Sequence, residues 1–379
     1  MINYTQVPSP AYILDESRLR RNLELIQKVQ QESGVSVILA LKGFSMWKVF
    51  PLVKQYLAGA TASSLHEARL IFEEMGVQAH TYSPAYLPDE FVEIMRYSSH
   101  ITFNSVAQYE RFWGPLSQAE RPISPGLRVN PEFSVVETDL YNPSAAGSRL
   151  GTMLENLGGQ LPAGIEGLHI HTLCESSAED TANLLEAVEA RFGVFFPQLK
   201  WINFGGGHLM TRQGYNIKHL IKALQAFRAR NPHLEVILEP GSAIAWETGE
   251  LISTVLDIVD SHGVKTAILD VSFTAHMPDT LEMPYRPKVL GATDPMPGKP
   301  TYRLGGVSCL AGDFMTEYSF EQELQVGDRL ILWDMIHYTM VKTTTFNGVK
   351  HPDICIWHED DQLEVVKHFG YEDFRGRLS

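Results

Sequence analysis

The sequence predicts an α/β protein in which an N-terminal (β/α)8 barrel precedes an all-β C-terminal domain. Short apolar segments alternate with amphipathic helical stretches over the first two-thirds of the chain, which favours a parallel barrel with helices outside. After Pro240-Gly241 the helical period disappears, and strand-like segments follow one another with turns between them. The length of 379 residues also exceeds what one hydrophobic core normally supports, so two domains are expected.

Eight short segments are the predicted barrel strands. They span 37–42, 59–64, 80–84, 101–104, 126–130, 167–172, 201–205 and 235–239. Amphipathic helical patterns between them include 65–75, 178–192 and 217–230. Ser64 is a predicted N-cap, with Glu67 three residues further on. A doubly wound open sheet would give the same alternation, and that alternative stays open here.

The C-terminal part of the chain reads as strands joined by turns. Strand-like segments are 251–259, 266–271, 302–307, 329–332, 354–357 and 363–368. Tyr12-Ile13-Leu14 is also strand-like, although it precedes the first barrel helix. We therefore expect residues 1–25 to pair with the β domain, residues 26–245 to form the barrel and residues 246–379 to form the β domain.

The composition of the chain indicates which kinds of partner it can bind and which cellular compartment it occupies. The formal net charge of -14 argues against nucleic acid and is compatible with a cationic substrate. The three cysteines, Cys174, Cys309 and Cys355, are odd in number and far apart, which indicates a reducing compartment. The N-terminus lacks the pattern of a signal peptide, and no apolar run is long enough to span a bilayer. We expect a soluble cytoplasmic protein with no membrane partner.

A lysine ends the first predicted barrel strand, in the run Val37-Ile38-Leu39-Ala40-Leu41-Lys42-Gly43. An ammonium group seldom ends a buried strand, because an unpaired buried charge costs several kcal/mol. Lys42 is therefore either a solvent-exposed or ion-paired lysine or a group that performs chemistry at the barrel mouth. Catalytic side chains of such barrels lie at the C-terminal ends of strands.

Two histidines, His169 and His171, lie on one face of the strand predicted at 167–172, because side chains alternate along a strand. No third ligand with metal-like spacing follows them, so we expect no metal. The alternatives are core histidines held by hydrogen bonds, or a flat ring that stacks on a planar cofactor.

Two further strand ends carry chemistry-bearing patterns. Gly205-Gly206-Gly207 directly follows a strand, where successive N–H groups can hold a phosphate, although a plain turn looks similar. Glu239 ends the last barrel strand and would be either a structural carboxylate or the partner of a pyridine nitrogen. In the β domain, Cys309 is either an exposed proton donor or a small buried residue, and Tyr338 either a phosphate ligand or a packing residue.

In this order, the motifs resemble the fold-type III pyridoxal-phosphate decarboxylases, which include the ornithine, arginine and diaminopimelate enzymes. The resemblance runs nearly end to end. It is strongest for the branch that acts on carboxynorspermidine and carboxyspermidine, and four segments carry that closer match. They are Ala40–Phe44, His169–Glu175, Ser308–Asp313 and Tyr338–Gly348.

The resemblance implies that pyridoxal 5'-phosphate is the cofactor and assigns a role to each matching residue. Lys42 would hold the cofactor covalently, His171 would stack on its ring, and Glu239 would face the ring nitrogen. Cys309 would reach in from the partner subunit of a homodimer and reprotonate Cα. The other implied cofactor contacts are Gly205, Gly206, Gly207, Tyr338 and Arg128, and Ser63 and Glu67 match the second-strand region.

Two positions depart from the ornithine enzymes. Ser242 follows Glu-Pro-Gly where they carry a phosphate-binding arginine, and Cys174 stands where they carry a serine, so phosphate anchoring must differ. The expected substrate is a carboxylated polyamine, whose cationic tail requires carboxylates. The candidates for that role are Asp270, Asp313, Glu175 and Asp279.

The predicted activity is decarboxylation of carboxynorspermidine or carboxyspermidine to norspermidine or spermidine in polyamine biosynthesis. An acid at position 239 favours decarboxylation, because racemases of this fold type favour an arginine there. A diaminopimelate- or ornithine-type decarboxylase is the alternative activity. A non-catalytic regulatory homologue is a further alternative, and Lys42 and Cys309 argue against it because such proteins lose one or the other.

Overall fold

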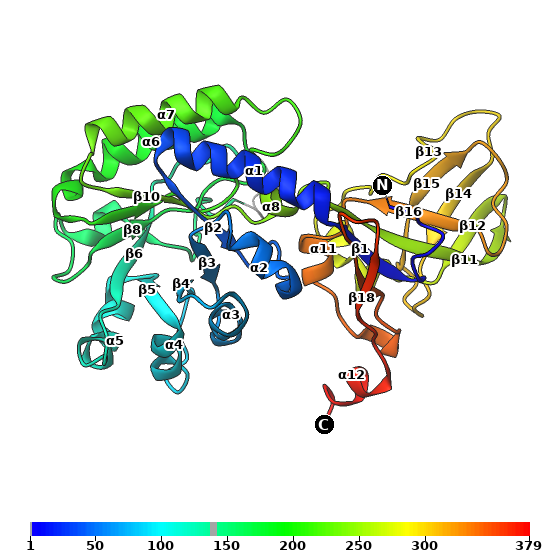
Figure 1. The fold of residues 1–379 in the computed structure, drawn as a ribbon, viewed down its shortest axis with the longest axis horizontal. Coiled ribbons are helices and arrows are strands. Elements are labelled where there is room, and N and C mark those ends of the chain that lie inside the picture. Colours follow the sequence, from blue (N-terminus) through cyan, green and yellow to red (C-terminus); the bar gives the residue numbers. More distant parts are fainter. Residues whose placement is uncertain (1, 137–141) are drawn as a thin grey trace. The chain divides into compact units, whose positions relative to one another are not determined.

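The computed structural model describes residues 2–136 and 142–379 of the chain (Figure 1). It consists of two compact units. One unit comprises residues 22–244, and the other combines residues 1–21 with residues 245–379. The division at residues 21 and 22 falls inside one continuous helix, α1 (Glu16–Ser33), as does the end of the segment 1–25 set apart above. Each unit is described separately below.

The unit of residues 22–244 is a closed barrel of eight parallel strands. The strands are β2 (Ser36–Ala40), β3 (Gly59–Ala62), β4 (Ala79–Tyr82), β5 (Ser98–Phe103), β6 (Ser124–Asn130), β8 (Gly167–His169), β9 (Trp201–Asn203) and β10 (Glu235–Leu238). They pair in that order, and β10 pairs with β2 to close the ring. The short β7 (Thr152–Met153) extends β6 outside the ring. A closed barrel excludes the doubly wound sheet.

Helices precede, connect and follow the barrel strands. They are α1, α2 (Phe50–Val53), α3 (Leu65–Leu70), α4 (Phe91–Tyr97), α5 (Val106–Ser117), α6 (Ala178–Phe192), α7 (Ile217–Arg230) and α8 (Ser242–Ala245), with short η1 (Trp47–Val49), η2 (Ile71–Met75), η4 (Leu154–Leu157) and η5 (Gly193–Gln198). The Ser64 hydroxyl accepts the N–H of Glu67, as predicted for the N-cap of α3. Ser177 and Asp180 form a capping box at α6.

Trp201 at the start of β9 fills the end of the barrel where the strands begin. It is buried, and its indole N–H donates to the Ser124 hydroxyl at 2.8 Å. The ring lies against Gly126 and Gly167, where an added Cβ would come within 2.3 and 2.0 Å of it. Two glycines on neighbouring strands therefore make room for one large side chain.

The second unit is built on a nine-stranded sheet. Its strands are β1 (Ala11–Asp15), β11 (Gly249–Ser261), β12 (Val264–Leu269), β13 (Ala292–Thr293), β14 (Thr301–Gly305), β15 (Phe314–Phe320), β16 (Arg329–Trp333), β17 (Asp353–Trp357) and β18 (Leu363–Lys367). Short helices lie between them: α9 (Phe273–His276), α10 (Pro278–Glu282), α11 (Tyr338–Val341), η6 (Phe346–Gly348) and α12 (Tyr371–Arg375). β1 runs antiparallel to β11 and parallel to β17.

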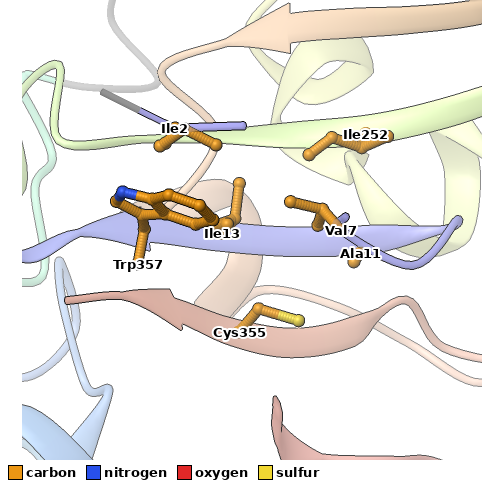
Figure 2. Packing of buried hydrophobic residues seen from close by; sticks show 7 residues of the cluster. All are labelled: Ile2, Val7, Ala11, Ile13, Ile252, Cys355 and Trp357. Carbon is orange, nitrogen blue, oxygen red and sulfur yellow. The ribbon is translucent and has the colours of Figure 1, made fainter. Parts of the chain in front are cut away.

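The N-terminal strand β1 is held in this sheet by apolar packing as well as by pairing. Figure 2 shows side chains of β1 between those of β11 and β17. The packed residues are Ile2, Val7, Ala11, Ile13, Ile252, Cys355 and Trp357. Cys355 therefore serves as a small buried apolar residue in this cluster.

The barrel and the separate sheet unit confirm the predicted fold class. Several details differ from the sequence-based expectation. β2 ends at Ala40, so Lys42 lies in the turn after the strand. β8 ends at His169, so His171 follows the strand and does not share a strand face with His169 as predicted. β15 was not predicted, because its sequence Phe-Met-Thr-Glu-Tyr-Ser-Phe does not alternate clearly between apolar and polar residues. No helix in the described ranges has the length and apolar content needed to cross a bilayer.

Candidate active site

A cavity of about 670 Å³ opens where the barrel strands end. The turn after β2 contributes Lys42, and β4 and β8 contribute their last residues, Tyr82 and His169. Glu239 directly follows β10. The remaining described lining residues are Ala40, Thr61, Ser63, Pro84, Arg128, Asn142, Pro143, Ala145–Leu150, His171 and Gly206. Polar side chains from six strands therefore converge at the barrel mouth, as expected for this fold.

Lys42 lines this cavity, and its side chain is exposed to the solvent there. Its Nζ lies 3.0 Å from Nε2 of His171. Desolvation lowers the pKa of Lys42, and the positive charge of Arg128 lowers that pKa further. A lysine with a lowered pKa is more often neutral, and only the neutral amine is a nucleophile.

The contacts of His171 define its tautomer. The Gly206 N–H lies 2.9 Å from Nδ1, and because an amide N–H only donates, Nδ1 must be the acceptor. Burial and the charge of Lys42 lower the pKa of His171 well below its usual value, so the ring is neutral. Its single proton then lies on Nε2, the ring atom that is 3.0 Å from Nζ of Lys42. One backbone amide in the glycine turn thus orients the ring toward the lysine.

Glu239 is a buried carboxylate held in its ionised form. Nε2 of His169 lies 3.2 Å from Oε2, and the Asn203 side-chain amide donates to Oε1 at 2.6 Å. Burial would raise the pKa of Glu239, but His169 and Asn203 outweigh that effect and lower it to about 2. Glu239 therefore presents a fixed negative charge at the wall of the cavity.

A stack of three side chains forms one wall of the site. The Arg128 guanidinium lies 4.7 Å from the centre of the Tyr82 ring, and that ring stacks on His169 at 5.3 Å. Nη2 of Arg128 also donates to the backbone oxygen of His171 at 3.1 Å. Arg128 is only 4% exposed, so its charge acts on the site with little screening by water.

The glycine turn after β9 is tightly enclosed. A Cβ on Gly206 would lie 2.6 Å from the backbone oxygen of Glu239, and a Cβ on Gly207 would lie 2.3 Å from that of Leu173. The φ of Gly207, +91°, also favours glycine. The Gly205 N–H donates to Oδ1 of Asn203, and Gly206 donates to His171. The N–H groups of Gly205 and Gly206 were predicted to bind phosphate. To do so, each would have to give up the hydrogen bond that it makes here.

The loop after the histidine strand carries two of the residues singled out above. Cys174 is half-buried, and burial raises the pKa of its thiol, followed by the charge of Glu175. Glu175 is exposed and adopts a φ of +47°, which is uncommon for a residue with a side chain. It is absent from the described cavity lining.

Cys309 and Tyr338 belong to the second unit. Cys309 is exposed in the loop between β14 and β15, and its N–H donates to Oδ1 of Asn347 at 2.8 Å. Tyr338 is the first residue of α11. Both positions are fixed by the second unit, and their roles remain those that the resemblance implies.

Two of the carboxylates predicted to bind the substrate accept hydrogen bonds from residues of their own unit. Asp270 accepts hydrogen bonds from the hydroxyls of Ser9 and Ser253 and from the N–H of Thr254. Asp313 accepts the N–H groups of Thr274 and Ser308 and is 4% exposed. These contacts tie β1, β11 and β12 together and close the Cys309 loop, so both carboxylates have structural partners.

Two residues of the site were missed by the sequence reasoning. Asn203 connects Glu239 to the glycine turn, and Tyr82 carries the stack of Arg128 and His169. Both are the last residues of barrel strands, β9 and β4. The strand-end rule therefore contained the signal, although neither residue type stands out in the sequence.

The arrangement fits a phosphorylated pyridine aldehyde. Such a group needs a nucleophilic lysine, an anion at the ring nitrogen, a flat side chain against the ring and a narrow backbone turn for the phosphate. Lys42, Glu239, His171 and the turn at Gly205–Gly207 supply these features around one cavity. His169 and His171 each have non-metal partners, Glu239 and Lys42, so the pair is not arranged as metal ligands.

The fold and this site define a barrel-plus-sheet enzyme of the class that uses pyridoxal phosphate. The family model described as "pyridoxal-dependent decarboxylase, C-terminal sheet domain" matches residues 11–336. The chain belongs to this pyridoxal-dependent decarboxylase family.

Two relatives and one crystal structure are similar over nearly their full length. A carboxyaminopropylagmatine decarboxylase from Synechocystis is 52% identical over 374 residues, which cover 99% of this chain and 96% of the relative. A carboxynorspermidine/carboxyspermidine decarboxylase from Campylobacter jejuni is 42% identical, with 98% of both chains covered. The crystal structure of carboxynorspermidine decarboxylase with norspermidine from that organism superposes with a TM-score of 0.90 at 41% identity, covering 98% of this chain and 100% of the other.

Proposed function

We propose that this protein is a cytoplasmic decarboxylase that converts carboxynorspermidine or carboxyspermidine into norspermidine or spermidine with pyridoxal 5'-phosphate. The observation that supports it most is the convergence of Lys42, His171 and Glu239 on one cavity. The name of the relative at 42% identity supplies the substrates. The three free cysteines of the described chain are in keeping with a reducing compartment.

Each residue at the barrel mouth has a defined task in this proposal. Lys42 would hold the cofactor through its amine, His171 would orient that amine and lie against the ring, and Glu239 would keep a proton on the pyridine nitrogen. The bound cofactor supplies the electron sink for the electrons that the departing CO2 leaves behind. His169 and Asn203 lower the pKa of Glu239 to about 2, so this carboxylate is ionised at neutral pH.

Reprotonation of the product carbon is assigned to Cys309. Its thiol is exposed, whereas Cys355 is buried in the sheet and Cys174 is half-buried. An exposed thiol can both donate its proton and recover it from water. We propose that this thiol acts in the site of a second subunit, within a homodimer.

A second candidate substrate is carboxyaminopropylagmatine, because the relative named for it is 52% identical to this chain. An agmatine tail ends in a planar guanidinium with several fixed donors, whereas a norspermidine tail ends in a compact ammonium. The two substrates share the carboxylated end, which the same chemistry would process. They therefore differ in the groups that bind the tail.

A turnover assay of the holoenzyme decides between these activities. The rate of CO2 release is measured side by side for carboxynorspermidine, carboxyspermidine, carboxyaminopropylagmatine, diaminopimelate and ornithine. We expect kcat/KM to be highest for one of the carboxylated polyamines, and a preference for diaminopimelate or ornithine would refute the proposal.

Borohydride treatment followed by peptide mapping should place the cofactor on Lys42, with Lys222→Ala as the control and Lys42→Ala as the variant that takes up no label. A purified protein that binds no cofactor would instead support the non-catalytic alternative.

A further inference from the structure

The loop that carries Cys309 joins β14 to β15 and is closed by Asp313. The Gly306 N–H donates to the backbone oxygen of Asp313 at 2.7 Å, and the Ser308 N–H donates to its Oδ2 at 3.0 Å. Oδ1 of Asp313 accepts the N–H of Thr274 in α9, also at 3.0 Å. These bonds fix the loop as far as Ser308 and hold it to α9, whereas Cys309 lies beyond them and is exposed.

Asn347, which is 38 positions further along the chain, holds the backbone of Cys309 itself. Its Oδ1 accepts the Cys309 N–H at 2.8 Å. Asn347 lies in η6, and the segment that leads into η6 is also fixed to α9, because the Thr344 N–H donates to the backbone oxygen of Ala275 at 2.7 Å. The Cys309 loop and the Asn347 turn are therefore anchored on neighbouring residues of α9, and the asparagine side chain joins them at the cysteine.

Asn347 makes this contact from an uncommon backbone conformation. Its φ of +55° and ψ of 8° lie in the left-handed region, which is costly for most residues with a side chain and less so for asparagine. Asn347 is exposed, so buried packing does not stabilise this conformation. Strain of this kind persists where the surrounding contacts hold it. The hydrogen bond to Cys309 is such a contact, and it directs the asparagine side chain at the loop.

We propose that Asn347 is a positioning residue for the reaction, which fixes the backbone of Cys309 and thereby the reach of its thiol. This inference rests on the proposed function, which assigns reprotonation of the product carbon to Cys309. Proton transfer requires the donor at hydrogen-bond distance from the carbon, so freedom of the donor's backbone slows that step. Substrate binding does not require the thiol. Loss of the contact should therefore lower kcat and leave KM nearly unchanged.

Two variants of Asn347 separate the hydrogen bond from the backbone conformation. Asn347→Gly keeps the left-handed turn, which glycine adopts freely, and removes the acceptor. We expect kcat to fall about 5- to 10-fold and KM to stay within about twofold of wild type. Asn347→Asp tolerates the same φ and retains an acceptor, so kcat should stay within about twofold of wild type. Its negative charge disfavours a thiolate nearby, so alkylation of Cys309 by iodoacetamide should require a higher pH.

His262→Gly is the matched control for Asn347→Gly. His262 is exposed in the turn between β11 and β12, has a φ of +53° and precedes a left-handed glycine, Gly263, as Asn347 precedes Gly348. The same relief of backbone strain at this second turn should leave both kcat and KM at their wild-type values.

Hydrogen exchange of the holoenzyme, followed by mass spectrometry, tests the contact without reference to activity. In Asn347→Gly the peptide that contains Cys309 should exchange one further amide rapidly, whereas in His262→Gly and Asn347→Asp its exchange should match wild type. Full activity of Cys309→Ala would refute the donor assigned in the proposed function, while the exchange data would still show whether Asn347 fixes the loop. Lost protection in Asn347→Gly with unchanged kcat, a raised KM in place of a lowered kcat, or equal losses of kcat in Asn347→Gly and Asn347→Asp would overturn the inference.

Discussion

The side-chain amide of Asn203 donates to Glu239 at 2.6 Å, and its oxygen accepts the N–H of Gly205 at 2.8 Å. One amide group therefore fixes both the acid and the turn at the barrel mouth. The next residue of that turn, Gly206, orients His171 toward Lys42. The group that would face the ring nitrogen and the group that would hold the cofactor are thus connected through a single short segment of backbone.

Replacement of Asn203 by aspartate should disrupt this arrangement selectively. The new carboxylate could still accept the Gly205 N–H, but it would lie against Glu239, and two buried carboxylates this close share a proton. The pKa of the pair rises, so the ring-nitrogen contact is lost as the pH falls through that new pKa. We expect kcat to fall about 10- to 100-fold at neutral pH and to recover partly at higher pH, as measured in a pH–rate profile.

Asn231→Asp provides the matched control for this variant. Asn231 is also buried, and its amide donates to Glu189 at 3.0 Å at the end of α7, among residues outside the described cavity lining. The same change of charge should lower stability there and leave the pH–rate profile unaltered. An unaltered profile in Asn203→Asp as well would contradict the role assigned to Glu239 and Asn203.

The cysteines provide a test of the proposed proton donor. Burial raises the pKa of Cys174, and burial together with Asp353 raises that of Cys355 to about 12. Cys309 is the exposed thiol, so iodoacetamide should modify it first and inactivate the enzyme at the same rate, as followed by mass spectrometry. In Cys309→Ala the fast phase should disappear and kcat should fall at least about tenfold, with KM changed much less. A raised KM with unchanged kcat would make Cys309 a binding residue.

Strand-end positions could be predicted from the sequence because a parallel barrel concentrates function at one edge. The eight apolar segments located Lys42, His171 and Glu239 to within two residues of the strands that carry them. In such a fold, a short run of apolar residues marks a strand that is buried on both faces. The residues that follow the run are therefore expected at the barrel mouth.

The contacts that tune these groups could not be predicted in the same way. The tautomer of His171 depends on the amide of a residue 35 positions away, and the ionisation of Glu239 depends on His169 and Asn203. Asp270 and Asp313 illustrate the opposite case. Both resemble ligand carboxylates in sequence, yet backbone N–H groups and hydroxyls of their own unit satisfy them. Only the three-dimensional arrangement distinguishes a free carboxylate from an engaged one.

The packing of Trp201 against two glycines leads to a prediction about stability. In Gly167→Ala the new Cβ would lie 2.0 Å from the indole ring, which is too close for any contact, so the ring must shift within a closed barrel. We expect a loss of about 1–3 kcal/mol in the free energy of unfolding, measured with urea. Gly114→Ala in α5 adds a Cβ with nothing within 4 Å and should instead stabilise by about 0.5–1 kcal/mol. Equal effects of the two variants would show that the indole is free to move.

Two buried histidines should make stability depend on pH in the weakly acidic range. Burial lowers the pKa of His208 to about 4 and that of His276 to about 3, the latter with a contribution from His351. Both stay neutral in the folded protein, whereas in the unfolded chain they bind protons below their ordinary pKa of about 6.5. The stabilisation is therefore complete above that pH and is lost as the pH falls, by at most about 1.4 kcal/mol per pH unit for each histidine. Urea unfolding at pH values from about 7 to 5 should show this slope, and His208→Asn or His276→Asn should each reduce it. His66→Asn, at an exposed position, should leave the slope unchanged, and a slope unaffected by either buried variant would assign the pH dependence to other groups.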